Sequence, residues 1–185
     1  MNHFDFLKES LRNLRTTGAV ARSSKYLVRE MMQPIDFFNA KIIVELGAGD
    51  GVLTEALLNR MSPEALLLCF EINPEFCKIL RGAIDDSRFV LIEDSAENLE
   101  KHLWELGFRE ADYIMSAIPF IALPNDLVHR IVSVCHKVLK NKGLYIQYHY
   151  SSFIQRMYRK HFGNVQVEFV PFNIPPAFVM ICEKK

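Results

Sequence analysis

The chain has few cysteines, no long apolar run and no excess of either charge. Its four cysteines lie far apart without a C-x-x-C pair. This spacing indicates neither a zinc site nor a disulfide framework, and it favours reduced thiols in the cytoplasm. No run of apolar residues approaches the roughly 20 residues that a transmembrane helix needs. We therefore expect a soluble protein, or one that touches a membrane only from the side.

The balance of charge argues against nucleic acid as a partner. Lysine plus arginine and aspartate plus glutamate number 22 each, so no global field draws the chain to a polyanion. The 185 residues, half of them apolar, are enough for one domain with a sizeable core but few for two. We predict a single domain over residues 1–185, whose core is formed by residues 41–185, and no metal site.

From residue 41 onward, strand patterns alternate with helix patterns. The expected strands are 42–46, 66–71, 89–93, 113–117 and 143–148, and the expected helices are 52–60, 74–81, 96–106, 124–139 and 151–161. Two further strands, 165–170 and 177–182, follow without a helix between them. This order predicts an α/β fold with a doubly wound, Rossmann-like, mostly parallel seven-stranded sheet that contains an antiparallel strand in a C-terminal hairpin.

Two additional helices are expected before the sheet. Residues 3–15 place four apolar side chains at helical spacing beside a basic line, which is the pattern of an amphipathic helix. Such a helix can lie in an anionic lipid interface, and it can equally pack against its own domain. Ser23 and Ser24 can cap a second helix that ends before Pro34.

The most informative stretch joins the first predicted strand of the core to the first helix. Residues 44–51 read Val-Glu-Leu-Gly-Ala-Gly-Asp-Gly, and glycines at alternate positions let the backbone turn sharply and approach a ligand closely. The spacing differs from the G-x-G-x-x-G of a pyrophosphate site, and Glu45 would repel such a group. An acid here favours a cationic ligand, and S-adenosylmethionine fits because it has both an ammonium and a sulfonium.

Acidic residues also follow the next two predicted strands. Ligands of an open α/β sheet bind beyond the carboxyl ends of its strands. Glu71 ends the second strand, where its carboxylate can accept both hydroxyls of a ribose. Asp94 follows the third strand and can equally act as a helix cap. Three acids at successive strand ends behind one glycine loop favour a shared binding site.

Residues 45–51 resemble motif I of the class I S-adenosylmethionine-dependent methyltransferases, which reads acid-x-G-x-G-x-G. The residues around Asp94 resemble the third motif of that family, whose acid takes the adenine amino group. The resemblance implies S-adenosylmethionine as cofactor, bound by Glu45, Gly47, Ala48, Gly49, Gly51, Glu71, Ile72, Asp94, Ser95, Ala96 and Ser116.

Nearly the whole chain is similar to the bacterial phospholipid N-methyltransferases, which convert phosphatidylethanolamine stepwise to phosphatidylcholine. The more particular marks are Gly-Ala-Val-x-x-Ser-Ser at 18–24, Ser-Ala-Ile-Pro at 116–119 and Asn-x-Pro-Pro-Ala at 173–177. The chain has Arg22 where proline is common and Ala117 where glycine is common, which leaves the substrate range open. The resemblance implies methylation of the ethanolamine amine by a peripheral protein on the inner face of the membrane, with residues 1–33 as a lid and residues 3–15 on the anionic surface.

The reaction requires an aligned amine and an acceptor for its proton. We expect the catalytic residues among Tyr26, Ser116, Pro119, Tyr148 and His149, and the substrate-binding residues among Arg22, Lys25, Phe120, Tyr150 and Asn173. Each of these also has an ordinary structural interpretation, as a packed aromatic, a solvated charge or a turn residue.

Three other functions stay open at this point. Pro119 and Phe120 after the fourth strand favour an rRNA adenine dimethylase, which the neutral charge and the missing amide in that motif oppose. A small-molecule methyltransferase with an N-terminal lid is a second alternative. A non-catalytic module that binds S-adenosylmethionine is the third.

Overall fold

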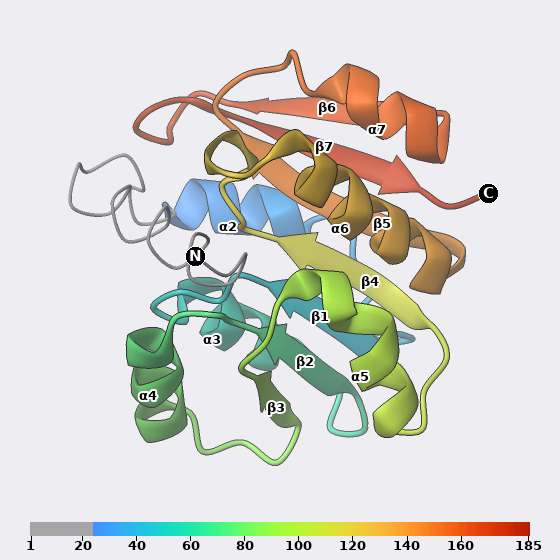
Figure 1. Cartoon of the computed structure of the whole chain (residues 1–185). Helices are drawn as coiled ribbons and strands as arrows, with labels where there is room; N and C mark the ends of the chain where they lie inside the picture. Colours follow the sequence, from blue (N-terminus) through green and yellow to red (C-terminus); the bar gives the residue numbers. More distant parts are fainter. Residues whose placement is uncertain (1–23) are drawn as a thin grey trace.

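The computed structural model describes residues 24–185 (Figure 1). Its elements follow one another as α2 (Lys25–Met32), β1 (Ile42–Leu46), α3 (Val52–Leu58), β2 (Leu66–Phe70), α4 (Pro74–Ala83), β3 (Phe89–Ile92), the 3₁₀ helix η1 (Ala96–Asn98), α5 (Leu99–Glu105), β4 (Ala111–Ser116), the 3₁₀ helix η2 (Phe120–Ala122), α6 (Asn125–Val138), β5 (Leu139–His149), α7 (Gln155–Phe162), β6 (Val165–Val170) and β7 (Ala177–Glu183). None of the helices in this part of the chain is long and apolar enough to cross a membrane.

The strands form one seven-stranded sheet in the order β3-β2-β1-β4-β5-β7-β6. Strands β1 to β5 are parallel, whereas β7 runs antiparallel to both of its neighbours, β5 and β6. The prediction of a mostly parallel sheet with one antiparallel strand is therefore confirmed. The chain moves outward from β1 to β3 and then returns to place β4 on the other side of β1. This reversal opens the crevice in which α/β folds bind their ligands.

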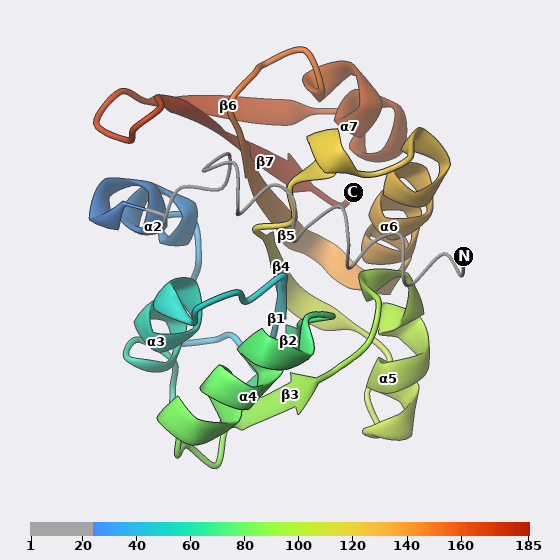
Figure 2. The ribbon, with the colours of Figure 1, turned by 60° about the vertical axis from the view of Figure 1, so that its left-hand side comes forward.

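Helices cover both faces of the sheet, as Figure 2 shows, with α2, α3 and α4 on one side and α5, α6 and α7 on the other. The apolar residues of α6 recur every three to four positions, so one stripe of this helix is buried. Strand β1 is buried along its whole length because it lies at the centre of the sheet with helices on both faces. This rigid centre holds the loops that follow β1, β2 and β4.

Three elements differ most from the sequence pattern in where they begin or divide. The helix expected at 96–106 is split into η1 and α5, because the Ser95 side chain accepts from the Glu97 amide and caps a 3₁₀ turn. Strand β5 begins at Leu139, and a bulge precedes Gly143, whose added Cβ would lie 2.8 Å from the Lys140 carbonyl oxygen. Helix α7 begins at Gln155, after a turn in which the Ser151 hydroxyl accepts from the Phe153 amide.

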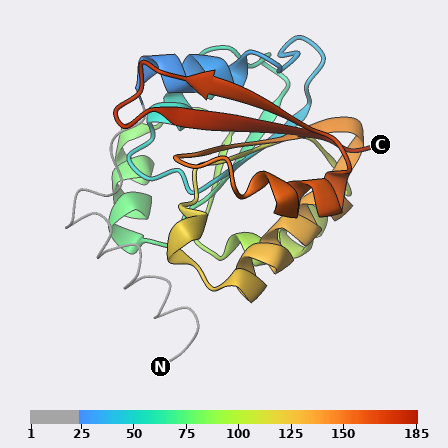
Figure 3. The same ribbon diagram turned by 90° about the horizontal axis from the view of Figure 1, so that it is seen from above.

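The hairpin of β6 and β7 packs along α2 (Figure 3). Ser24 caps α2, since its hydroxyl accepts from the Leu27 amide at 3.2 Å. The Ser24 amide in turn donates to the Asn173 side-chain oxygen at 3.2 Å, which fixes the start of α2 to the loop between β6 and β7. The first predicted helix, residues 3–15, and Arg22 lie outside the described residues.

Candidate active site

The glycine loop after β1 is bound to the end of β2. The amides of Gly47 and Ala48 both donate to the Phe70 carbonyl, at 2.8 and 3.3 Å, and the Gly49 amide donates to Glu71 Oε2 at 2.9 Å. The three glycines of the loop have φ angles of +80°, +57° and +86°, a region that side chains rarely adopt. The loop is therefore a rigid turn held directly against the next strand.

Gly47 also leaves room for a neighbouring loop. A Cβ at this position would lie 3.1 Å from Ile118 Cγ1 and 3.4 Å from the Ile118 amide nitrogen. Ile118 follows β4, so the glycine loop and the loop after β4 are in direct contact at the switch in strand order. This contact brings together two of the segments in which the sequence predicts site residues.

Glu45 lies beneath this loop and is fully buried. Its Oε2 accepts from the Thr54 hydroxyl at 2.8 Å and from the Cys69 thiol at 3.2 Å, while its Oε1 has no partner among the described residues. Burial raises the pKa of Glu45 to about 7, although the bonds from Thr54 and Cys69 act in the opposite direction. An unpaired buried acceptor is costly and fits a ligand ammonium group, either directly or through a water molecule.

Glu71 is buried at the end of β2 and connects two turns. Its Oε1 accepts from the Asn73 amide at 2.8 Å, and its Oε2 accepts from Gly49 in the glycine loop. Asn73 caps α4, whose first residue is Pro74, so the turn after Glu71 is itself rigid. The carboxylate is thus fixed beside the glycine loop, and Ile72 follows it half-buried.

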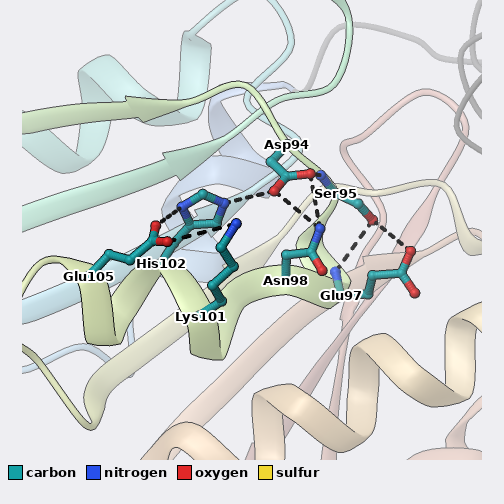
Figure 4. Close-up of polar contacts among 7 residues, drawn as sticks. All are labelled: Asp94, Ser95, Glu97, Asn98, Lys101, His102 and Glu105. Atoms are coloured by element: carbon teal, nitrogen blue, oxygen red, sulfur yellow. Dashed lines mark hydrogen bonds and ion pairs between the residues drawn. The ribbon is translucent and has the colours of Figure 1, made fainter.

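Asp94 after β3 has both carboxylate oxygens engaged within the protein (Figure 4). It accepts from the Ser95 amide at 2.7 Å, from Asn98 Nδ2 at 3.0 and 3.1 Å, and pairs with His102 Nε2 at 2.7 Å. Burial would raise the pKa of Asp94, but the bonds from His102, Ser95 and Asn98 outweigh it and lower the pKa. An adenine amino group at Asp94 would have to share lone pairs that these donors already use. Ala96 is buried at the start of η1.

A cavity of about 660 Å³ lies beyond β4 and β5. It is lined by five residues expected at the site, Pro119, Phe120, Tyr148, His149 and Tyr150, and by Ala117, Ile118, Ile121, Leu123, Asn125, Val128, His129, Ser151, Phe153, Ile154 and Met157. Among these lining residues none is lysine, arginine, aspartate or glutamate. Ile118 contacts Gly47, so the cavity opens directly beside the glycine loop.

Ser116 is not among the cavity-lining residues but directly precedes Ala117, which is, and His149 lines the cavity. Ser116 is fully buried beside Leu46 of β1, and its hydroxyl accepts from the Ile118 amide at 3.4 Å. His149 Nε2 lies 2.7 Å from the Tyr158 hydroxyl, and the imidazole ring lies 5.9 Å from the Phe120 ring. Burial lowers the pKa of His149 to about 4, which keeps the imidazole neutral at pH 7.

Lys25 and Asn173, predicted to bind substrate, and Tyr26, predicted to be catalytic, do not line the cavity. Lys25 lies on the surface with Nζ 5.5 Å from the centre of the Tyr26 ring, and Tyr26 packs against Phe172. Asn173 is buried. Its side chain accepts from the Ser24 amide and donates to the Pro175 carbonyl at 2.7 Å. These residues gather where α2 meets the β6–β7 hairpin. Within residues 24–185, no group of histidine, cysteine, aspartate and glutamate is arranged to hold a metal ion.

The sequence pattern did not indicate Gln147 and Tyr158, whose side chains bond to one another behind the cavity. Gln147 is a buried amide within the run Leu-Tyr-Ile-Gln-Tyr of β5, and an amide in such a run is a sequence signal of a polar network. Tyr158 gave no comparable signal, because an aromatic residue on a helix is ordinarily a packing residue.

Comparisons with known proteins agree with this geometry. The model of the methyltransferase domain family matches residues 43–143. An ornithine lipid N-methyltransferase from Singulisphaera acidiphila is 30% identical over 181 residues, which cover 97% of this chain and 94% of that protein.

Solved methyltransferases share the fold at low identity. A 1,6-didemethyltoxoflavin N1-methyltransferase from Burkholderia thailandensis, solved with S-adenosylhomocysteine, has a TM-score of 0.72 at 13% identity over 98% of this chain and 88% of that chain. A precorrin-6y C5,15-methyltransferase from Geobacter metallireducens has a TM-score of 0.69 at 13% identity over 88% of this chain and 89% of that chain. The glycine loop, the orphaned Glu45 oxygen and these matches together show that the chain belongs to the class I S-adenosylmethionine-dependent methyltransferases.

Proposed function

We propose that the protein transfers methyl groups from S-adenosylmethionine to the primary amine of a membrane lipid headgroup. The observation that carries this proposal is the apolar cavity, which meets the glycine loop at Ile118. The similarity to an ornithine lipid N-methyltransferase supports a lipid amine. Ornithine lipid is therefore the first substrate to test, and phosphatidylethanolamine, which the sequence motifs favour, is the second.

The cavity suits the amine end of a lipid better than its anionic group. Its volume of about 660 Å³ lies inside the usual range for a small-molecule site. The residues that line it include no lysine or arginine. A phosphate or carboxylate therefore forms no ion pair there while the two lining histidines are neutral. We expect the amine and its neighbouring methylene groups to enter, while the anionic group stays nearer the solvent.

The residues of this chain would bind, orient and exclude water rather than perform acid-base chemistry at the methyl group. Bound S-adenosylmethionine supplies a methyl group that is already activated by the sulfonium. The chain's task is to hold a neutral amine in line with that methyl group. Phe120 and Tyr148 offer ring faces to the methylated ammonium product through cation–π attraction.

Labelled methyl groups provide the test. Vesicles that contain ornithine lipid, phosphatidylethanolamine or neither are incubated with the protein and radiolabelled S-adenosylmethionine, and the extracted lipids are separated. The proposal expects label in at least one of the two amino lipids and none in vesicles that lack both. Label in RNA or in a water-soluble amine, with neither lipid modified, would instead support one of the alternative methyltransferases.

Glu45 makes cofactor affinity depend on pH. Its pKa is raised to about 7 by burial, whereas a ligand ammonium prefers the ionised carboxylate, so one proton must leave on binding. We expect calorimetry to show affinity that falls below pH 7, by up to about tenfold per pH unit, because each unit costs about 1.4 kcal/mol. Glu45→Gln should bind more weakly at pH 8 and lose this slope. A wild-type affinity that is flat between pH 5.5 and 8 would exclude this role.

The same carboxyl group affects stability in the absence of ligand. Its folded pKa of about 7 lies above the usual pKa of a glutamate, 4.5, so the stability it contributes is present below pH 4.5 and is lost as pH rises through 7. Glu45→Gln should therefore unfold at a higher temperature than the wild type at pH 8, and this gain should shrink at pH 5. The comparison also shows that weaker binding by the variant is not a folding defect.

Two exposed apolar side chains at the cavity support attachment to a membrane surface. Ile121 and Phe153 line the cavity although they are 93% and 90% exposed. Each large apolar side chain buried in an interface contributes roughly 1.5–3 kcal/mol. We propose that they enter the lipid layer around the cavity mouth of a protein bound to the inner face of the membrane. The contact by residues 3–15 stays a prediction, since that segment lies outside the described residues.

Charged substitutions test this contact. Ile121→Glu with Phe153→Glu should lower sedimentation with anionic vesicles by at least tenfold, while the unfolding temperature changes little because both side chains are exposed. Phe38→Glu is the matched control, because Phe38 is 85% exposed but precedes β1 at the opposite end of the strands. Equal vesicle binding by the double variant and the control would rule out the contact.

A further inference from the structure

A chain of buried polar side chains runs behind the cavity. Tyr145, Gln147 and His149 alternate along β5 and therefore point to the same face of the sheet. Tyr158 of α7 packs against that face and lies between Gln147 and His149. Tyr145, Gln147 and Tyr158 are fully buried, so each donor and acceptor among them must be matched within the protein.

The orientation of the Gln147 amide is fixed by its neighbour. Gln147 lies 2.8 Å from the Ile118 carbonyl oxygen, which can only accept, so the Gln147 Nε2 must face it. The Gln147 Oε1 then faces the opposite way and accepts from the hydroxyls of Tyr145 and of Tyr158, the latter at 2.9 Å. The Tyr145 hydroxyl is also hydrogen-bonded to the side chains of Ser116 and Tyr158. Because Gln147 Oε1 cannot donate, the Tyr158 hydroxyl donates its proton to Gln147.

The tautomer of His149 follows from this arrangement. Because the single hydroxyl proton of Tyr158 goes to Gln147, its oxygen can only accept from the His149 Nε2, which lies 2.7 Å away. His149 therefore carries its proton on Nε2, and the lone pair is on Nδ1. This second nitrogen has no hydrogen-bond partner among the described residues, and His149 lines the cavity.

We infer that Gln147 and Tyr158 are positioning residues that hold His149 as the Nε2–H tautomer, so that Nδ1 accepts a hydrogen bond from the substrate amine in the cavity. The inference rests on the proposed function, since it assigns the acceptor of that amine. It also connects the chemistry to the loop after β4, because Gln147 bonds to Ile118, the residue that contacts Gly47.

The role of His149 is then to orient a neutral amine rather than to remove a proton from an ammonium. The low pKa of about 4 keeps the ring neutral but makes it a weak base. Transfer from an alkylammonium with a pKa near 10 would be uphill by about six orders of magnitude in the equilibrium constant. A neutral amine that donates one N–H to Nδ1 has its lone pair directed elsewhere and free to attack a methyl group.

Nitrogen NMR of the full-length protein tests the tautomer without any substrate. Histidine is labelled with ¹⁵N, and long-range ¹H–¹⁵N spectra are recorded at pH 7, with the His149 signals identified by their loss in His149→Asn. The wild type should show a protonated Nε2 and an unprotonated Nδ1. Tyr158→Phe removes the acceptor of the Nε2 proton and should give a mixture of tautomers. Tyr145→Phe, the matched control, also loses a buried hydroxyl but should leave the tautomer unchanged.

Kinetics with the lipid amine test the consequence. Tyr158→Phe should lower kcat by about tenfold with little change in the KM for lipid, while Tyr145→Phe stays within about threefold of the wild type. His149→Asn, whose side-chain oxygen takes the place of Nδ1, should retain more activity than His149→Ala. A wild-type spectrum with the proton on Nδ1, or an unchanged tautomer in Tyr158→Phe, would overturn the inference.

These outcomes separate the inference from the function on which it rests. If the wild type methylates a lipid amine but His149→Ala is as active as the wild type, the role of His149 is wrong and the proposed function stands. If the wild type modifies neither amino lipid, the proposed function fails, and with it the substrate role of Nδ1, whatever the tautomer.

Discussion

Replacing Gly47 by valine should abolish measurable binding of S-adenosylmethionine, with an affinity loss of at least about 100-fold. The φ of +80° at this position strains any side chain, and a β-branched one most of all, at about 1–3 kcal/mol. The new Cβ would also lie 3.1 Å from Ile118 Cγ1. The loop must therefore move away from the strand end that defines the site, and calorimetry with S-adenosylhomocysteine measures the result.

The matched control for this substitution is Gly107→Val. Gly107 has a similar φ of +85°, but a Cβ there meets nothing within 4 Å and the residue lies in the turn after α5. It should lower the unfolding temperature through backbone strain and leave cofactor affinity within about twofold. If Gly47→Val also bound the cofactor normally, the glycine loop would not be the cofactor site.

Replacing Glu71 by alanine should weaken cofactor binding by about 100-fold. Hydrogen bonds to a charged group contribute about 1.5–3 kcal/mol each, and we expect this carboxylate to accept two from the ribose. The variant also leaves the amides of Gly49 and Asn73 without their acceptor, which loosens the glycine loop. Equilibrium dialysis with labelled S-adenosylmethionine gives the affinity, and the unfolding temperature reports the structural part of the effect.

Two comparisons make this prediction specific. Glu75→Ala removes an exposed carboxylate from the first turn of α4. It therefore removes the same charge as Glu71→Ala but leaves the end of β2 unchanged. It should bind the cofactor within about twofold of the wild type. Asp94→Asn should weaken binding less than Glu71→Ala, because asparagine keeps one acceptor oxygen at position 94, whereas alanine at position 71 also removes the acceptor of the Gly49 and Asn73 amides. An undiminished affinity in Glu71→Ala would place the nucleoside elsewhere.

The arrangement of the candidate cofactor site could largely be predicted from the sequence because its determinants are local. The position of Glu45 relative to the glycines, and of Glu71 at a strand end, depends only on a strand-turn-helix pattern and on the rule for parallel sheets. The burial of Glu45 and its bonds to Thr54 and Cys69 were not predictable, since they depend on how α3 and β2 pack on β1.

The sequence contains a signal for the internal partners of Asp94. Asp94, Asn98 and His102 are spaced four residues apart, which is the spacing of side chains on one helix face. That pattern predicts a capped helix start rather than a free carboxylate. It explains why the Asp94 carboxylate bonds to residues of η1 and α5, and why Asp94 is expected to contribute less to the ligand than Glu71.

The proposed substrate site was harder to predict, because it depends on contacts between segments that are far apart in the sequence. Asn173 meets Ser24 across 149 positions, and nothing in either local pattern indicates this pairing. Lys25 and Tyr26 were expected near the amine, but they lie with Phe172 outside the cavity lining. The cavity itself is formed by loops from β4 and β5 and by α6 and α7, whose relative placement only the folded sheet defines.

The most direct measurement is a crystal structure of the protein with S-adenosylhomocysteine and a short-chain amino lipid. The account predicts the ribose at Glu71, the amino group of the homocysteine near the Glu45 side of the glycine loop, and the lipid amine in the cavity between Ile118 and His149. A nucleoside bound away from the glycine loop, or a lipid amine seated outside this cavity with the cofactor in place, would contradict it.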